Sequence, residues 1–258
     1  MTDSLQEILE TIELSADVIA DHRNTIYDAT LKDSRYMKEG NFKSFHPEDL
    51  HRMYTLYDEL FYEHQLEEGL ADLPITFGIS KKMTKAGGKT TRHWKRGKPH
   101  VATRFEISFS APLLFQTFQD VQRDVSINGV LCHDRLEALQ LVFEHELTHL
   151  SEFLIWDKSS CKGNRFQSVA TRMFGHVEYT HQLITQAERA LSKYQIRVGD
   201  IVSFEYGGEQ HVGLVNRITK RVTVLVQSSN GERYNDGKRY AKYYVPLDLL
   251  TKVESGVS

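Results

Sequence analysis

The residues best suited to chemistry are His145-Glu146-Leu147-Thr148-His149, inside an apolar run from Leu139 to Trp156. Residues four apart return to the same face of a helix, so His145 and His149 can hold one metal ion between them. Glu146 follows the first histidine, where its carboxylate can take a proton from a metal-bound water whose pKa zinc lowers toward ~7. The segment therefore predicts a zinc site with Glu146 as the catalytic base.

A buried helix with two hydrogen-bonded histidines is the plainer interpretation of the same segment. The helix is apolar on nearly all sides, which predicts that it lies at the centre of the fold. Its apolar residues are Leu139, Val142, Phe143, Leu147, Leu150, Phe153 and Leu154. Polar groups buried there without partners would each cost about 1–3 kcal/mol. This cost favours the metal site.

The composition predicts a cytoplasmic globular protein. Its 258 residues, 40% hydrophobic and 26% charged with a formal net charge of −3, suit one large domain or two unequal ones. The two cysteines, Cys132 and Cys161, are too few for a disulfide framework and fit a reducing compartment. The N-terminus MTDSLQEILE has no signal-peptide pattern, and no run approaches the ~20 apolar residues that span a bilayer. We expect no membrane association.

Hydrophobic periodicity and turn residues predict the elements around the site. Before it, we expect a peripheral helix over 4–20, irregular or weakly helical chain over 21–43, a helix from Pro47 toward Gly69, strands at Ile75–Ser80 and Phe105–Ser110, a short helix over 113–123 and a loop over 124–133. The metal helix begins after Asp134, which with Glu137 forms an N-capping pattern, and ends near Asp157. A helix closed by Gly175 and one from Thr185 to about Tyr194 follow.

Residues Lys81 to Arg104 are the most basic stretch, with nine Lys or Arg and no Asp or Glu. A run of charges is ordinarily a solvated loop, but nine like charges repel one another unless an anion offsets them. A nucleic-acid backbone would do so through counterion release. The predicted contacts include Trp94, stacked on unpaired bases, so single-stranded DNA is the favoured partner. The others are Lys85, Lys89, Arg92, Lys95 and Arg96.

The order of these elements resembles the SprT-like (Spartan-like) zinc metallopeptidase family over roughly residues 45 to 185. The resemblance rests on the helix ending in Leu60-Phe61, the strand ITFGIS, the turn Ala86-Gly87-Gly88-Lys89, the strand FEISFS, the motif HELTH and the helix beginning KGNRF. It implies an α+β fold with a minigluzincin-like core, and zinc held by both histidines of the motif and a third downstream. It also implies a protein or peptide substrate. Eukaryotic members cleave proteins crosslinked to DNA, whereas many bacterial members have no settled substrate.

The chain departs from this family at the third zinc ligand. Lys162 stands where the family has His, and a protonated amine cannot replace an imidazole. Cys161 can bind zinc as a thiolate, although cysteine is also a common buried apolar residue. Glu152 shares the helix face of the histidines and can bind the metal or orient a ligand. His176 lies ~18 Å further along the next helix if that helix starts near the metal, because the rise is ~1.5 Å per residue. We predict Cys161 as the third ligand, with His176 as second choice.

From Arg197 onward, short alternating strands and glycine-rich turns predict a small all-β barrel. The turns are Gly207-Gly208, Ser228-Ser229-Asn230-Gly231 and Asn235-Asp236-Gly237. The patterns Val198-Gly199-Asp200 and Gly213-Leu214-Val215-Asn216 resemble SH3-like or KOW-type modules. The tyrosines of this region are Tyr234, Tyr240, Tyr243 and Tyr244, and the basic residues beside them are Lys220, Arg221, Lys238, Arg239 and Lys242. The tyrosines could stack on bases while the basic residues hold phosphates, or they could form the barrel core within a solvated basic rim.

Three parts are therefore expected: an N-terminal helical extension (1–44), a zinc metallopeptidase domain (45–194) and an SH3-like barrel (195–258). The favoured function is zinc-dependent peptide hydrolysis on proteins at or near nucleic acid. The alternative is a non-catalytic nucleic-acid-binding protein with structural zinc, because a closed four-ligand site leaves no position for water. Metal-dependent hydrolysis of another substrate also stays open.

Overall fold

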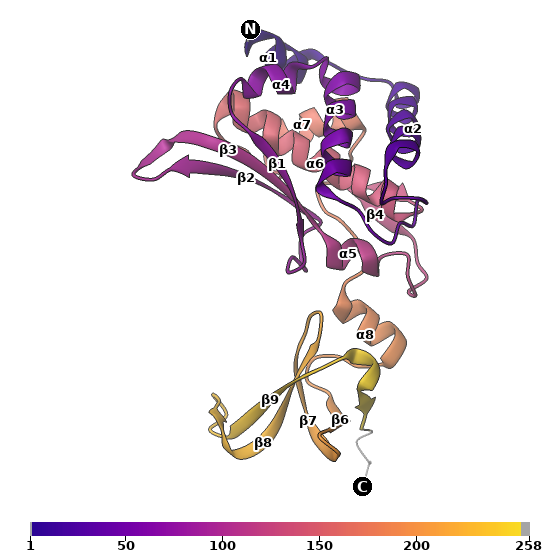
Figure 1. The fold of residues 1–258 in the computed structure, drawn as a ribbon, viewed down its shortest axis with the longest axis vertical. Helices are drawn as coiled ribbons and strands as arrows, with labels where there is room; N and C mark the ends of the chain where they lie inside the picture. Colours follow the sequence, from indigo (N-terminus) through magenta and orange to yellow (C-terminus); the bar gives the residue numbers. More distant parts are fainter. Residues whose placement is uncertain (1, 254–258) are drawn as a thin grey trace. The chain divides into compact units, whose positions relative to one another are not determined.

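The computed structural model describes residues 2–253, except for the side chains of residues 2, 3, 99 and 100. The chain divides into two compact units, Met1–Leu183 and Ile184–Ser258 (Figure 1). The α+β class predicted from the sequence is confirmed. Across the described residues, no helix combines the length and apolar character needed to cross a membrane.

The first unit combines helices with a small sheet and a hairpin. Its helices are α1 (Thr2–Thr11), α2 (Ala16–Asp33), α3 (Pro47–Tyr62), α4 (Gln65–Leu70), α5 (Ala111–Gln116), α6 (Arg135–Trp156) and α7 (Asn164–Phe174). Its strands are β1 (Ile75–Ser80), β2 (Gly88–Lys95), β3 (Lys98–Ser110), β4 (Val125–Ile127) and β5 (Val130–Cys132). In Figure 1 the long β2–β3 hairpin projects beyond the helices of this unit.

The three-stranded sheet packs one face on α6. Its order is β1-β3-β2, with β1 parallel and β2 antiparallel to β3. Alternate residues of β3 are buried on the helix side, and the Phe109 ring stacks on Phe143 of α6 at 5.0 Å between centroids. Strand β2 lies at the sheet edge, so it is the strand that runs beside the predicted metal residues.

Helix α6 forms the centre of this unit, as its apolar sequence predicts. Asp134 caps it by accepting hydrogen bonds from the backbone N–H groups of Leu136 and Glu137, at 2.9 Å each. Asp157 ends it in the left-handed conformation. On the side of α3, Tyr57 stacks on Phe143 with 5.5 Å between ring centroids.

Several predicted elements differ from the structure. The single peripheral helix expected over 4–20 is two helices, because α1 ends at Thr11 and α2 runs from Ala16 to Asp33. The predicted loop at 124–133 forms the β4–β5 hairpin, with Asn128 and Gly129 at positive φ in its turn. The strand expected at Phe105 begins earlier, at Lys98, because the basic stretch pairs as a hairpin.

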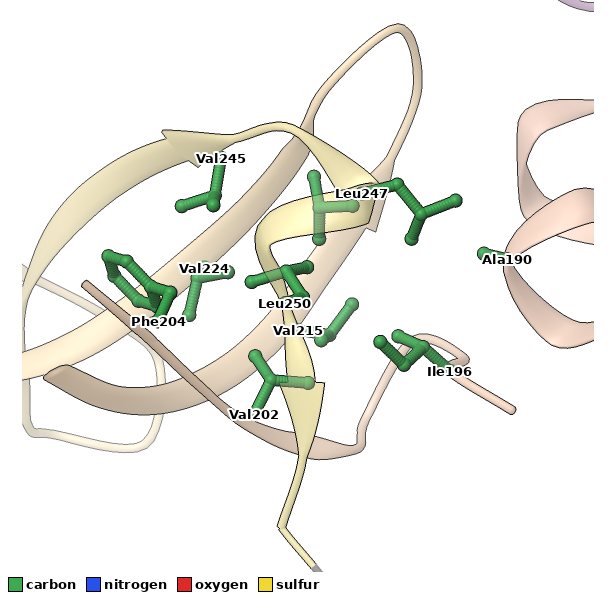
Figure 2. Close-up of a cluster of buried hydrophobic side chains, with 10 residues drawn as sticks. Ala190, Ile196, Val202, Phe204, Val215, Val224, Val245, Leu247 and Leu250 are labelled. Atoms are coloured by element: carbon green, nitrogen blue, oxygen red, sulfur yellow. The ribbon is translucent and has the colours of Figure 1, made fainter. Parts of the chain in front are cut away.

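In its described residues, the second unit contains one α-helix and a five-stranded sheet. Its elements are α8 (Gln186–Tyr194), β6 (Ile201–Tyr206), β7 (Glu209–Ile218), β8 (Val222–Arg233), β9 (Arg239–Val245), the 3-10 helix η1 (Leu247–Leu249) and β10 (Thr251–Lys252). Ala190 of α8 and Ile196 join the buried cluster of this unit (Figure 2). Helix α8 therefore belongs with the strands, and the division lies before this helix rather than at residue 195.

The strands of the second unit form an open sheet. Their order is β10-β6-β7-β8-β9, and among the described residues β9 and β10 do not pair to close the predicted barrel. The turn expected at 228–231 is instead part of β8, with a register shift between Gln227 and Glu232. Gly231 permits this path, because an added Cβ would lie 2.2 Å from the carbonyl carbon of Tyr240.

Candidate metal centre

Three predicted metal ligands lie together in the structure. The ligand atoms of His145, His149 and Cys161 all lie within 4.8 Å of one another, and each residue is half-buried. The histidines come from successive turns of α6, and Cys161 comes from the segment just before α7. Two imidazoles and a thiolate are a donor set that suits zinc, and three protein donors are typical of catalytic sites.

Hydrogen bonds at Nδ1 orient both imidazoles. Asn128 Nδ2 donates to the Leu141 carbonyl, so its Oδ1 accepts from His145 Nδ1 at 3.2 Å. Ser159 Oγ lies 2.6 Å from His149 Nδ1. Because the Nδ1 atoms carry the protons, the Nε2 lone pairs are left for a metal. Neither Asn128 nor Ser159 was singled out from the sequence.

Glu152 acts behind His149 rather than beside the metal ligands. Its Oε2 accepts from Ser159 Oγ at 2.6 Å, and its Oε1 accepts from Arg165 Nε at 2.7 Å. Ser159 therefore donates to Glu152 and accepts from His149, which fixes the imidazole tautomer. Both carboxylate oxygens are engaged, so the alternative that Glu152 binds the metal is not supported by the geometry.

His176 lies in a separate buried network. Its Nε2 is 2.7 Å from Glu144 Oε2, and the same carboxylate accepts two hydrogen bonds from Arg23, at 2.6 and 2.7 Å. Burial would raise the pKa of Glu144, but the Arg23 guanidinium and the His176 hydrogen bond hold it below its ordinary value. Burial lowers the pKa of His176. His176, the second-choice ligand, is therefore part of a hydrogen-bond network that links α6 to α2 and to the end of α7.

Both candidate ligand histidines are held neutral. Burial lowers the pKa of His145 to about 3, with a further contribution from His149, and burial lowers the pKa of His149 to about 4. The ring of Phe166 covers both imidazoles, at 4.9 and 4.6 Å between centroids. Neutral imidazole is the form that binds metal, so the surroundings favour binding at neutral pH.

Glu146 combines burial with a tuned pKa. The residue is 4% exposed, and Thr90 Oγ1 of β2 donates to its Oε2 at 2.7 Å. Burial raises the pKa of Glu146 to about 7, although the Thr90 hydrogen bond opposes the shift. A carboxylate with this pKa can both accept and release a proton near neutral pH.

Gly88 leaves the space that the Glu146 side chain fills. A Cβ added at Gly88 would lie 2.7 Å from Glu146 Cγ. The glycine at the start of β2 thus lets the edge strand pass close to α6.

An open cavity of about 390 Å³ lies over His145 and Glu146. Its walls come from the segment before β2, the β4–β5 turn and the segment after α7. The other lining residues are Lys85, Ala86, Gly87, Gly88, Ile127, Asn128, Val142, Tyr179, Thr180 and His181. The candidate base and one candidate ligand therefore face a space large enough for part of a peptide.

The basic stretch finds part of its counterions within the chain. Arg92 donates to Asp157 Oδ1 at 2.6 Å, and its guanidinium lies over the rings of Trp94 and Phe153. Its side chain is only 11% exposed. Glu106 lies 3.1 Å from His93 and 3.6 Å from Arg104. The premise that these charges lack counterions is therefore wrong for Arg92 and Arg104, and Arg92 is not a free phosphate ligand.

The remaining predicted contacts of the basic stretch lie at the surface. Trp94 is half-exposed, with one side of its ring next to Arg92. The four predicted cations other than Arg92 are exposed, namely Lys85, Lys89, Lys95 and Arg96.

The tyrosines of the second unit do not form a single platform. Tyr234 and Tyr240 make an edge-to-face pair, next to which Lys242 is already paired with Glu232 at 2.5 Å. Tyr243 belongs to a different ring cluster, and Tyr244 is the next residue on the strand and points to the other face.

Comparisons with family models, with curated proteins and with solved structures found no match.

Proposed function

We propose that this protein is a zinc-dependent peptidase of the SprT-like kind, with a minigluzincin-like core in its first unit. The observation that carries the proposal is the convergence of His145, His149 and Cys161 within 4.8 Å, one residue from a buried carboxylate that faces an open cavity. The second unit is proposed to be related to SH3-like modules, and the protein to act in the cytoplasm.

His145, His149 and Cys161 would hold the zinc, and Asn128 and Ser159 would keep the two imidazoles in the tautomer that binds it. When bound, zinc acidifies a water and polarises a carbonyl. Glu146 takes the proton of the attacking water and returns it to the leaving amine. Thr90 holds the carboxylate in place during both steps.

The substrate class that this site fits is a protein or peptide. The cavity is open, and the segments 85–88, 127–128 and 179–181 line it together with Glu146. The exposed lysines of the β2–β3 hairpin support a further proposal that the substrate is met at or near nucleic acid, with single strands favoured over duplex.

A closed structural zinc site is the competing proposal. Lys162, which keeps this alternative open, is exposed and is not part of the ligand group. Within the part of the chain that the structure describes, the group has three donors rather than four, which supports the catalytic form of the site.

The test measures zinc content and peptidase activity on an unfolded protein substrate, for wild type and three variants. Wild type should carry about one zinc per chain and cleave the substrate. Glu146→Gln should keep the zinc and lose the cleavage, whereas His145→Ala and His149→Ala should lose both. Zinc retained in both histidine variants would refute the site, and full activity of Glu146→Gln would refute the role of the base.

A further inference from the structure

Four aromatic rings gather at one end of the sheet in the second unit. Phe204 and Tyr206 come from β6, His211 from β7 and Tyr243 from β9. Phe204 pairs with His211 in the strand register, so their side chains share a face. The ring centroids of Tyr243 lie 5.3 Å from Phe204, 5.3 Å from Tyr206 and 4.9 Å from His211.

This ring cluster runs from the core to the solvent. Phe204 is 3% exposed and belongs to the buried cluster, where Figure 2 draws it on the opposite side from Ala190. Tyr206, two residues further along β6 and hence on the same face, is 64% exposed. The inner rings thus hold the Tyr206 ring in place while its outer side is exposed to solvent. Packing of the core does not require this exposure.

An acidic side chain borders the exposed end of the cluster. Glu209 stands directly opposite Tyr206 across the β6–β7 hairpin, so its carboxylate is on the same face as the rings. Glu205, the neighbouring residue on β6, points to the other face of the sheet, and both glutamates are exposed. In the described part of the chain, neither carboxylate forms an ion pair, and no cationic side chain lies over these rings.

The same sheet contains a complete example of a cation held between a ring and a carboxylate. Lys242 Nζ lies 5.6 Å from the ring centroid of Tyr234 and 2.5 Å from Glu232. The first unit repeatedly sets guanidinium groups on rings as well, with Arg165 over Trp156 at 4.1 Å. Tyr206 and Glu209 present the ring and the carboxylate, and the matching cation has to come from another molecule.

We propose that the ring cluster and Glu209 bind an arginine side chain of a partner protein. A guanidinium group can stack on the face of Tyr206 while it donates to the Glu209 carboxylate. The negative charge of Glu209 disfavours a nucleic-acid backbone at the ring cluster, because like charges repel.

The test follows the backbone amide resonances of the full-length protein during titration with the peptide acetyl-Gly-Arg-Gly-amide. The amides of 204–211 and of Tyr243 should shift and saturate, with a Kd of about 1 mM for a single side chain. The matched peptide with Gln in place of Arg should cause no saturable shift. A single-stranded oligonucleotide should leave these resonances unmoved.

Two exposed positions provide variants that leave the fold intact. Tyr206→Ala should abolish the shifts, and Glu209→Gln should weaken binding several-fold. Tyr244→Ala is the matched control, because Tyr244 is 61% exposed on the other face of the sheet, and it should bind as wild type does. The proposal is overturned if these amides do not shift at an arginine-peptide concentration of 10-fold the expected Kd. It is also overturned if Tyr244→Ala loses the peptide-induced shifts as fully as Tyr206→Ala does, or if an oligonucleotide shifts the same amides.

Discussion

The buried carboxylate of Glu146 is expected to lower the free energy of unfolding of the zinc-free protein in a pH-dependent way. Burial raises its pKa from the ordinary 4.5 to about 7, so the folded state resists ionisation of this group. At 1.36 kcal/mol for each tenfold change in proton affinity, the cost is roughly 3 kcal/mol when the group is fully ionised. It is absent below pH ~4.5, grows as the pH rises and is complete above pH ~7.

Glu146→Gln removes this cost, because the amide does not ionise and has nearly the same shape. In chelator-treated protein, the variant should match wild type at pH 4 and exceed its free energy of unfolding by roughly 3 kcal/mol at pH 8. Bound zinc attracts the carboxylate charge, so the advantage should shrink in the loaded protein.

Denaturant unfolding at both pH values, with and without zinc, measures these differences. An equal difference between variant and wild type at pH 4 and pH 8 would show that Glu146 ionises as freely in the folded chain as in the unfolded one. Such a result would refute the role of Glu146 as a base with a raised pKa.

The remaining predictions concern the ligands, their supports and the basic hairpin. Cys161→Ser should weaken zinc binding markedly in a competition assay, whereas His176→Ala should keep zinc but lower stability, because it leaves buried Glu144 short of a partner. Ser159→Ala should lower zinc affinity about 10–100-fold, since His149 loses its orienting acceptor, and an unchanged affinity would contradict this. Four exposed cations can be replaced together by Ala: Lys85, Lys89, Lys95 and Arg96. This variant should bind single-stranded DNA more weakly and with a flatter salt dependence in fluorescence anisotropy, while its zinc content stays unchanged. Unaltered DNA binding would show that the basic stretch is only a solvated surface.

The sequence predicts best what is locally encoded. Helix α6 follows from its apolar pattern and from the cap at Asp134, and helical spacing alone brings His145 beside His149. Cys161 lies close enough along the chain for its loop to fold back onto the same helix. These parts of the candidate site could be predicted because few long-range contacts decide them.

The groups that support the site depend on contacts between distant parts of the chain. Asn128 meets His145 only because the β4–β5 turn packs against α6. Arg23 pairs with Glu144, 121 residues away, and this contact anchors a helix whose own apolar pattern is weak. Asp157 neutralises Arg92 across 65 residues, so no count of charges within the basic stretch could reveal it.

The sulfur atom of Cys161 makes the candidate centre open to oxidation. A thiolate ligand can be converted to sulfenic acid by hydrogen peroxide, whereas imidazole ligands resist such mild oxidants. The other cysteine, Cys132, is buried, and burial raises the pKa of its thiol to about 12, which leaves it unreactive. Oxidation of Cys161 Sγ alone would therefore account for loss of the metal under peroxide. The protein would lose its metal centre under oxidising conditions that a three-histidine site survives.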